Sequence, residues 1–272
     1  MGLRINTNVP AINASRVLRT STLALNKTLE RLSSGLRINR AADDAAGLAI
    51  AENFRAQIRG VQVAQRNSQD GISLVQTAEG ALSETTSILQ RIRELAVQAA
   101  NGTQSADNRL SLNQEVLQLL EQIDDIATDT EFNGIRVLSS GQTLTLQAGA
   151  MTSQTLTISV TGAQTSDLAA ISAVRVSTMA SAVSALSTID TALRSVSTLR
   201  SNFGAYQNRL EFTINTLAIQ EENSSASESA IRDANIATET IAFTRNQILV
   251  SAGTSVLAQA NIVPQTALQL LQ

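Results

Sequence analysis

The sequence predicts a mainly α protein: a long-helix coiled-coil bundle formed by pairing of the N- and C-terminal halves, with a small β-hairpin region. Three observations support this class. Apolar residues recur at alternating spacings of three and four over most of the 272 residues, which is the period of a coiled coil. Only two prolines occur, Pro10 and Pro264, so almost nothing between them interrupts a helix. The chain is 43% hydrophobic but only 2% aromatic, which favours helices packed through small aliphatic side chains.

Both ends of the chain carry an amphipathic helical pattern. Heptad positions near the start are held by Leu18, Thr22, Leu25, Leu29, Leu32 and Leu36, and heptad positions near the finish by Ala242, Leu249, Ala252, Val256, Ala260 and Val263. Each such helix needs a partner to cover its apolar stripe, and ordering an isolated arm costs more conformational entropy than its few buried side chains return. We therefore expect both ends to be largely disordered in the monomer and to fold against neighbouring copies.

The most regular pattern follows Ile58. Its seam steps by three and four through Val61, Ala64, Ser68, Gly71, Val75, Ala78, Leu82, Thr85, Leu89, Ile92, Ala96 and Ala99. A second apolar stripe runs beside it through Leu74, Ala81, Ile88 and Leu95. A helix with apolar contacts on more than one side belongs to a bundle rather than to a two-stranded coil.

The remaining middle of the chain predicts another helix, a hairpin and a long helix. Asn101-Gly102 is a plausible helix stop and Asp107 a plausible cap for a helix with apolar residues at Leu112, Val116, Leu119, Ile123 and Ile126. Phe132-Asn133-Gly134 indicates a turn. Between 137 and 166 the period changes to two, in 143–146 and 155–160, which predicts a β-hairpin. From about Ile171 a helix is expected again, in the register of Met179, Val183, Leu186, Leu193, Val196, Phe203, Leu210, Ile214 and Leu217.

Composition excludes most chemistry. The chain has no His and no Cys, so imidazole or thiolate metal sites and His-dependent catalysis are absent; we expect no enzyme, no cofactor and no metal. The net charge of −3 and the scattered arginines give no reason to bind nucleic acid. Residues 246–272 carry no charged side chain but many polar ones, which suits a packed interior and argues against membrane insertion. No targeting segment is expected at the start.

Few polar groups remain as candidates for a site. The adjacent pairs Asp43-Asp44 and Asp124-Asp125 point in different directions on a helix, so we interpret them as helix-start or solvated carboxylates. Asn101-Gly102-Thr103 satisfies a glycosylation sequon, and turn chemistry explains it equally well. Arg91, Arg93 and Glu94 are expected on a solvated helix face.

Several ungapped blocks resemble bacterial flagellin. Residues 32–50 (LSSGLRINRAADDAAGLAI) resemble the family's signature, and the segments 69–82, 89–95 and 132–134 resemble its next blocks. Segments 207–211, 257–261 and 264–265 resemble the C-terminal blocks. The similarity covers nearly the whole chain outside about 138–170.

The resemblance implies a structural subunit that self-assembles into the bacterial flagellar filament for swimming motility. It implies a D0 domain of terminal helices, 1–45 and 231–272, that forms an inner tube. A D1 helical bundle, 46–230, contains the β-hairpin region at about 137–166, and no outer D2 or D3 domain is expected. Inter-subunit packing in D0 is expected at Leu18, Leu25, Leu29, Leu32, Leu36, Leu249, Val256, Ala260 and Val263.

The resemblance also implies partners and a location. The chain is expected to form a homo-polymer, secreted through the flagellar type III export apparatus with a secretion chaperone, and assembled with filament cap and hook–filament junction proteins. Arg91, Leu95 and Glu115 match positions that engage the vertebrate flagellin-sensing Toll-like receptor. Segment 30–51 resembles the epitope of the plant receptor, and Leu268, Leu270 and Leu271 resemble leucines sensed by cytosolic inflammasome receptors.

Two other classes fit parts of the pattern. A hook–filament junction protein of the same superfamily shares the terminal helices, although that family generally keeps less of the 43–44 and 69–82 blocks. A signalling bundle such as a chemoreceptor cytoplasmic region also has long heptads. It should carry membrane spans and a central hairpin tip, which this sequence lacks.

Overall fold

The computed structural model describes residues 7–160 and 162–269, with side-chain surroundings given as far as 262. Two compact units emerge. One unit combines residues up to Ala56 with those from Asn223 onward, and the other comprises Gln57–Glu222. The domain boundaries expected from the sequence, near 45 and 231, lie at the start of helix α2 (Ala45–Ala100) and the end of helix α4 (Met179–Arg232). The boundary between the two observed units lies further inside both helices, after Ala56 and before Asn223. We call the first the terminal unit and the second the central unit.

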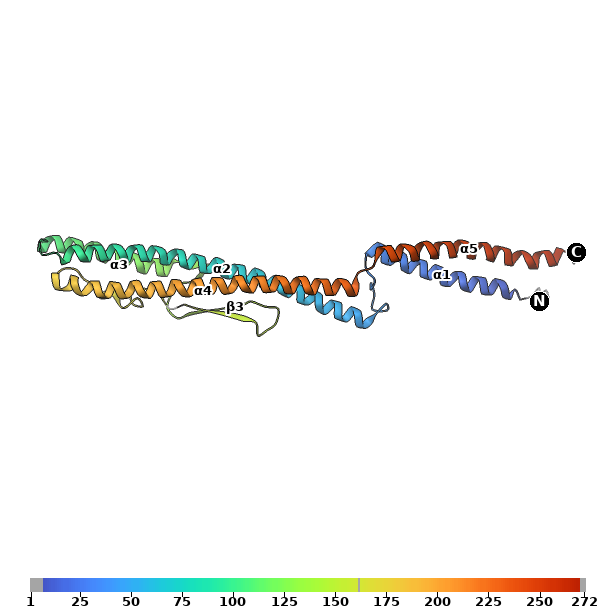
Figure 1. The fold of residues 1–272 in the computed structure, drawn as a ribbon, viewed down its shortest axis with the longest axis horizontal. Coiled ribbons are helices and arrows are strands. Elements are labelled where there is room, and N and C mark those ends of the chain that lie inside the picture. The colour runs from blue at the N-terminus through green and yellow to red at the C-terminus, as the bar shows by residue number, and fades with distance from the viewer. Residues whose placement is uncertain (1–6, 161, 270–272) are drawn as a thin grey trace. The chain divides into compact units, whose positions relative to one another are not determined.

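Long helices and a hairpin make up the chain, which confirms the predicted class (Figure 1). The chain begins with helices α1 (Val9–Ser34), α2 and α3 (Ala106–Asp129). Four short strands follow: β1 (Glu131–Phe132), β2 (Ile135–Arg136), β3 (Gln142–Gln147) and β4 (Thr155–Val160). The 3-10 turn η1 (Ile171–Ala173) leads into α4 and then helix α5 (Ile236–Gln269). No helix among the described residues is both long and apolar enough to span a membrane.

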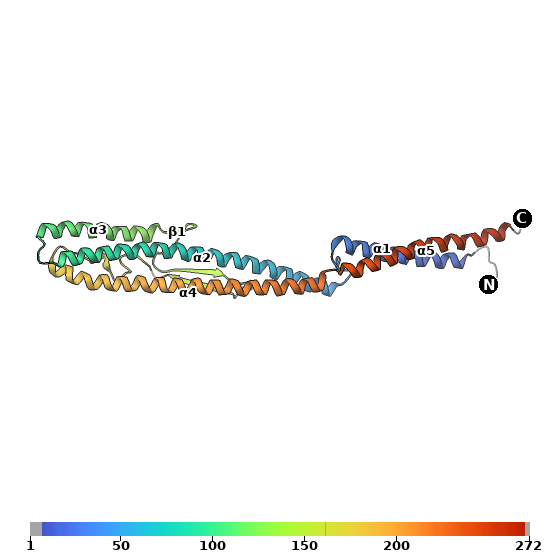
Figure 2. The same cartoon turned by 45° about the horizontal axis from the view of Figure 1, so that its top comes forward.

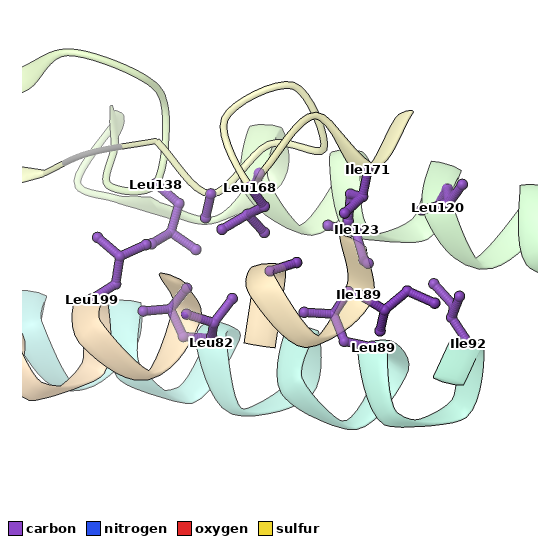
Figure 3. Packing of buried hydrophobic residues seen from close by; sticks show 14 of the residues in the cluster. Leu82, Leu89, Ile92, Leu120, Ile123, Leu138, Leu168, Ile171, Ile189 and Leu199 are labelled. Atoms are coloured by element: carbon purple, nitrogen blue, oxygen red, sulfur yellow. The ribbon is translucent and has the colours of Figure 1, made fainter. Parts of the chain in front are cut away.

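The core of the central unit forms on the seam predicted after Ile58. All twelve seam residues of α2 are buried. From Val75 onward the apolar seam residues join buried side chains of α3, α4 and the segment between them (Figure 3), and Val61 and Ala64 pack with Leu217 of α4. Leu82 and Leu89 of α2, Ile123 of α3 and Ile189 of α4 are each 0–1% exposed. Four sequence-distant segments thus share one apolar core, which is the arrangement of a bundle.

Helix α4 packs in a different register from the one predicted at its start. Met179 and Val183 are 51% and 55% exposed. The buried seam instead runs through Ala182, Ala185, Ile189, Ala192, Val196, Leu199 and Phe203. The prediction followed the larger apolar side chains, whereas Ala182, Ala185 and Ala192 share the buried face with Ile189 and Val196. The helix also begins at Met179 rather than near Ile171, because residues 171–173 form the separate turn η1.

The predicted hairpin is confirmed. Strands β3 and β4 pair antiparallel with Thr145 opposite Thr157, and β4 alternates exposed and buried residues along its length. Leu156, Ile158 and Val160 face the core at 3%, 0% and 2% exposure. The predicted turn at Asn133-Gly134 is also present, since it joins the paired strands β1 and β2.

Gly71 explains how the hairpin and α2 fit together. A Cβ on Gly71 would lie 2.5 Å from Leu146 Cδ1 of β3 and 3.3 Å from Leu210 Cδ1 of α4. This seam position therefore needs glycine for close packing, although glycine lowers helix propensity.

Two side chains of α3 anchor the long loop that follows β4. The Asp124 carboxylate accepts the Thr165 N–H and the Thr165 hydroxyl, both at 2.8 Å. Asn113 Oδ1 accepts the Val176 N–H at 2.9 Å. The interpretation of Asp124 as a helix-start or solvated carboxylate was wrong, because it lies in the last turns of α3 and holds a loop. The α3 cap is Ser105, which accepts the Asn108 N–H at 3.1 Å, and not Asp107.

In the terminal unit, α1 and α5 lie side by side (Figure 2). Helix α1 starts at the cap residue Asn8, with Pro10 in its first turn, and ends at Gly35 with φ +72°. Proline near the start and a left-handed glycine after the end are the usual helix boundaries. The connector 35–44 then meets the connector 233–235 through an antiparallel bridge between Leu36 and Asp233.

Candidate assembly surface

The contact between α1 and α5 covers only one side of each helix. Among α1 residues, only Ser21 and Thr28 are buried. Leu18 approaches α5 closely, because a Cβ on Gly253 would lie 3.1 Å from Leu18 Cδ1. Asn8 Nδ2 also donates to the Ala260 carbonyl at 2.8 Å. Within one chain, each terminal helix thus has only one partner helix. A bundle core needs further helices to cover the remaining sides.

Large apolar side chains remain exposed on the other sides of both helices. In α1 they are Val9, Ile12, Val17, Leu23 and Leu29, and in α5 they are Ile236, Ile241, Ile248, Leu249, Val256 and Ile262, with exposed fractions of 47–63%. We call these eleven residues the terminal stripe. Scattered exposed leucines are ordinary, but this many on two paired helices indicates a protein-binding surface.

The nine residues expected in D0 packing fall into three groups. Leu29, Leu249 and Val256 belong to the terminal stripe. Five others are half-buried within the chain's own pair and its connector: Leu18, Leu25, Leu32, Leu36 and Ala260. The side chain of Val263 lies outside the described residues. The expectation of inter-subunit packing therefore applies most directly to the first group.

The C-terminal part of the surface has no electrostatic barrier to self-association. After Arg245 no residue carries a side-chain charge. A shallow groove of about 410 Å³ begins there, lined by Ile241, Arg245, Ile248 and Leu249 among others. Arg245 is the charged residue at this groove, and the surface of α5 beyond it can approach a second copy without the cost of desolvating ions.

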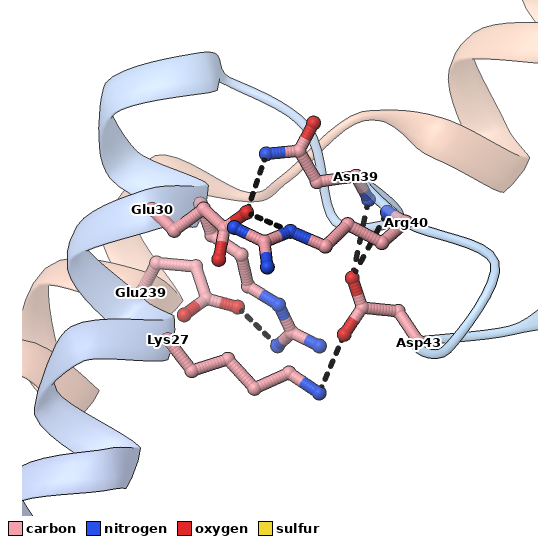
Figure 4. Close-up of polar contacts among 7 residues, drawn as sticks. Lys27, Glu30, Asn39, Arg40, Asp43 and Glu239 are labelled. Carbon is pink, nitrogen blue, oxygen red and sulfur yellow. Dashed lines mark hydrogen bonds and ion pairs between the residues drawn. The ribbon is translucent and has the colours of Figure 1, made fainter.

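Charged residues gather instead where connector 35–44 folds back on α1 (Figure 4). Lys27 Nζ lies 2.7 Å from Asp43 Oδ1, and the same carboxylate accepts the Asn39 and Arg40 N–H groups at 3.4 and 3.2 Å. The hydrogen bond from Lys27, followed by the backbone donors, lowers the pKa of Asp43 to about 2. Glu30 accepts Asn39 Nδ2 at 3.0 Å and Arg40 Nε at 2.9 Å.

The partner residue Asp44 has a different role. Its Oδ1 accepts the Gly47 N–H at 2.8 Å, so it caps the start of α2 as the helix-start interpretation predicted. A Cβ at Gly47 would lie 2.5 Å from Asp44 Oδ2, so the glycine leaves room for the cap.

A second ion cluster joins the first turns of α2 to the last turns of α4 inside the terminal unit. Arg232 lies 3.1 Å from Glu52, and Arg55 lies 3.0 Å from Glu52 and 3.5 Å from Glu228. The hydrogen bond from Arg55 is the main cause that lowers the pKa of Glu52. Glu52 is 53% exposed and its partner Arg232 is 13% exposed, so the cluster lies at the edge of the helix pair and fixes its orientation.

The residues expected to engage a vertebrate receptor lie in the central unit. Arg91 Nη2 and Glu115 Oε1 are 2.9 Å apart, and both side chains are exposed. This contact, followed by the one with Glu94, raises the pKa of Arg91. Leu95 is 1% exposed and belongs to the core. Two of the three residues are therefore brought together at the surface, and the third lies beneath it.

Another exposed apolar surface escaped sequence reasoning. Phe212 and Ile219 of α4 are 72% and 61% exposed. Phe212 lines a groove of about 720 Å³ with Leu156, Arg209 and other residues of α4 and the hairpin. Phe212 lies two residues after the buried Leu210 and therefore off the heptad seam. The chain has only five Phe, so a Phe at a position off the seam was a signal in the sequence for an exposed apolar surface.

No group of three or more acidic side chains in the described part of the chain is placed to hold a metal ion. The arrangement instead consists of paired long helices, an exposed apolar stripe and polar clamps at the connectors. These features define a protein of the long-helix bundle class with an exposed apolar surface on its terminal helices.

Family comparison agrees with this class. Residues 5–143 match the bacterial flagellin N-terminal helical region and residues 186–271 match the bacterial flagellin C-terminal helical region. The chain belongs to the bacterial flagellin family, which is a family of structural proteins.

Relatives match nearly the whole chain. A flagellin of Halalkalibacterium halodurans is 50% identical over 270 residues, which cover 98% of this chain and 99% of the relative. A flagellar filament 31.3 kDa core protein of Treponema maltophilum is 43% identical over 285 residues, with 98% and 99% covered. The crystal structure of a Bacillus cereus flagellin is 34% identical, with a TM-score of 0.51, and the match covers 60% of this chain and 94% of that one.

Proposed function

We propose that this protein, a structural subunit of the bacterial flagellar filament, polymerises by packing the terminal stripe against the same helices of neighbouring copies. The observation that carries the proposal is the exposure of Leu29 on α1 and of Leu249 and Val256 on α5. Helix α5 also carries no charged side chain beyond Arg245. Full burial of an exposed Leu or Val stabilises by roughly 1.5–3 kcal/mol; these side chains are about half exposed, so each can add about half of that, and eleven stripe residues together supply a large share of the assembly free energy.

The two units are proposed to divide the work in the filament. The terminal unit corresponds to D0 and forms the inner tube, and the central unit corresponds to D1 and forms the surrounding shell. The groove at Phe212 is proposed as a further contact between copies, because a large aromatic side chain this exposed is typical of an interface anchor. Substitutions that alter filament form without unfolding the central unit are expected in and around the hairpin 137–166.

Folding of the ends is proposed to accompany assembly. The structure pairs α1 with α5 inside one chain, so each helix already has part of its partner. The sparse burial of α1, with Ser21 and Thr28 alone inside, supports the expectation that the ends are disordered in the dilute monomer. Slow amide exchange at Leu18 and Leu25 in monomer would contradict this expectation.

A charge placed in the terminal stripe tests the main proposal. Leu249→Lys and Val256→Glu should leave the helical signal of the central unit in place and abolish pelletable filaments. Leu249→Met, which keeps an apolar side chain of similar volume, is the matched control and should polymerise. Normal filaments from both charged variants would overturn the proposal.

The partners implied by the resemblance are part of the same proposal. The chain is inferred to be secreted into an extracellular filament through the type III export apparatus, with a chaperone, the cap and the hook–filament junction proteins. A host receptor is inferred to contact Arg91 and Glu115. Loss of Toll-like receptor signalling in Arg91→Ala monomer, with unchanged thermal melting, would support that contact.

The hook–filament junction protein is the alternative role. Full-length matches to proteins named flagellin and filament core protein favour the filament. Electron microscopy with antibody labelling of material sheared from cells separates the two roles, because a filament subunit decorates the whole length and a junction protein decorates one end.

A further inference from the structure

The loop between α2 and α3 holds an Asn-Gly pair in an open setting. Asn101 and Gly102 directly follow the last residue of α2 and are exposed. Across the described residues, the Gly102 N–H donates no hydrogen bond. A Cβ at Gly102 would meet no atom within 4 Å. The Gly102 nitrogen is therefore free of a hydrogen bond among the described residues, in an exposed part of the loop.

The groups around this pair favour a reaction between them. The Thr103 N–H donates to Asn101 Oδ1 at 3.2 Å, which withdraws electron density from the carboxamide carbon. Arg109 Nη2 donates to the Asn101 carbonyl oxygen at 3.0 Å, and Arg109 Nε donates to the Ala99 carbonyl at 2.9 Å. The Asn101 carbonyl belongs to the same peptide group as the Gly102 nitrogen. A guanidinium on that oxygen stabilises the negative charge that the peptide group acquires when the nitrogen loses its proton.

We propose that Asn101 is a site of spontaneous deamidation. The deprotonated Gly102 nitrogen attacks Asn101 Cγ, a new C–N bond closes a five-membered succinimide, and the Cγ–Nδ2 bond breaks to release ammonia. Water then opens the ring at either carbonyl and leaves aspartate or isoaspartate. Water is the only co-reactant, and no oxidant or reductant takes part.

The second Asn-Gly pair of the chain is protected by its turn. Asn133 and Gly134 have φ of +51° and +77°, the left-handed values that a two-residue hairpin turn requires at both positions. Pairing of β1 with β2 holds this geometry, with Phe132 opposite Ile135. Ring closure must rotate Asn133 out of the left-handed region and break the turn. Two identical dipeptides therefore differ in reactivity because of the fold.

Deamidation at Asn101 changes the charge at the end of α2. Each event adds one negative charge to a chain of net −3. The new carboxylate stands at a helix C-terminus, where a negative charge is unfavourable, while Arg109 holds the backbone carbonyl of the same residue. Aged protein is thus expected to contain acidic forms that stay folded, with the change confined to this loop.

Peptide mapping of the full-length protein tests the proposal. Trypsin cleaves after Arg93, Arg109 and Arg136, so Asn101 and Asn133 fall in separate peptides. After incubation of folded protein in mildly alkaline buffer, aspartate and isoaspartate should accumulate in the Asn101 peptide well before the Asn133 peptide. In urea, where the turn is lost, the two peptides should react at similar rates.

Gly102→Ala is the matched control. The site has room for the methyl group and its φ lies outside the left-handed region, so the variant should fold normally. The methyl group hinders attack, and we expect the rate at Asn101 to fall about tenfold, equivalent to about 1.4 kcal/mol in the barrier. Equal or faster reaction at Asn133 in the folded protein, or an unchanged rate in Gly102→Ala, would overturn the proposal.

Discussion

Lys27 Nζ and Asp43 Oδ1 lie 2.7 Å apart and join helix α1 to the connector that leaves it. Lys27 is the single lysine of the chain. Because the Asp43 carboxylate also accepts two backbone N–H groups, one ion pair and two loop hydrogen bonds depend on the same charge. The connector is therefore a braced segment and not a free hinge.

The lowered pKa of Asp43 predicts a pH dependence of the terminal unit. Its pKa is about 2 in the folded chain against an ordinary value of 3.8, so the unfolded chain binds a proton more readily. The contribution of the Asp43 carboxylate to folding stability is fully present above pH 3.8 and is lost as the pH falls through about 2. Melting curves of Asp43→Asn should show a lower midpoint than the parent protein at neutral pH. The difference should shrink as the pH falls, and a difference that is constant down to the lowest pH would contradict this prediction.

Two glycines of α2 should respond to alanine with opposite sign. At Gly71 the new Cβ meets Leu146 at 2.5 Å, and such overpacking costs about 1–3 kcal/mol. At Gly80 nothing lies within 4 Å, so alanine should stabilise the same helix by about 0.5–1 kcal/mol. Urea unfolding of Gly71→Ala and Gly80→Ala measures both. A gain in stability at Gly71 would show that Leu146 moves aside freely.

Asp124 and its neighbour Asp125 should differ when each is changed to asparagine. Asp124→Asn weakens a charge-assisted pair of hydrogen bonds to Thr165, and we expect a loss of about 1–3 kcal/mol. Asp125 is exposed, so Asp125→Asn should stay within about 0.5 kcal/mol of the parent. The free energy of unfolding from urea titration, followed in the central unit, separates them; equal effects would contradict the anchoring role of Asp124.

Phe212 and Phe203 should separate assembly from folding. Phe212→Ser is expected to leave the melting temperature of the monomer nearly unchanged and to raise the critical concentration for polymerisation, because this side chain is 72% exposed. Phe203 is 2% exposed, and Phe203→Ala should cost about 3–5 kcal/mol of folding stability. Turbidity and sedimentation of both variants provide the measurement. A critical concentration unchanged in Phe212→Ser would remove the groove from the assembly surface.

The sequence predicted those features that depend on local period. The seam from Val61 to Ala99 is buried at every position because a three-four spacing directly specifies one face of a helix. The hairpin strands and the Asn133-Gly134 turn were equally visible, since period two and turn residues are local signals.

Features that depend on distant partners were missed. The register at the start of α4 was missed because Ala182 and Ala185 are buried there while the larger Met179 and Val183 are exposed. Small alanine side chains give a weak apolar signal in a sequence. The hold of Asp124 on Thr165 spans a hairpin and a loop, and no spacing in the sequence predicts it. For the same reason the nine residues expected in D0 packing could be placed at heptad positions, but the division between the half-buried ones and the exposed Leu29, Leu249 and Val256 came only from the pairing of α1 with α5.

The bridge between the two connectors couples both ends of the chain. Besides the pairing of Leu36 with Asp233, the Ala234 N–H donates to the Gly35 carbonyl and the Arg37 N–H donates to the Arg232 carbonyl, at 2.9 and 2.6 Å. Moving one terminal helix alone into another subunit breaks these backbone hydrogen bonds between the two connectors. Once the bridge has formed, exchange of a single terminal helix between copies is disfavoured, and a subunit in the polymer keeps its two terminal helices together.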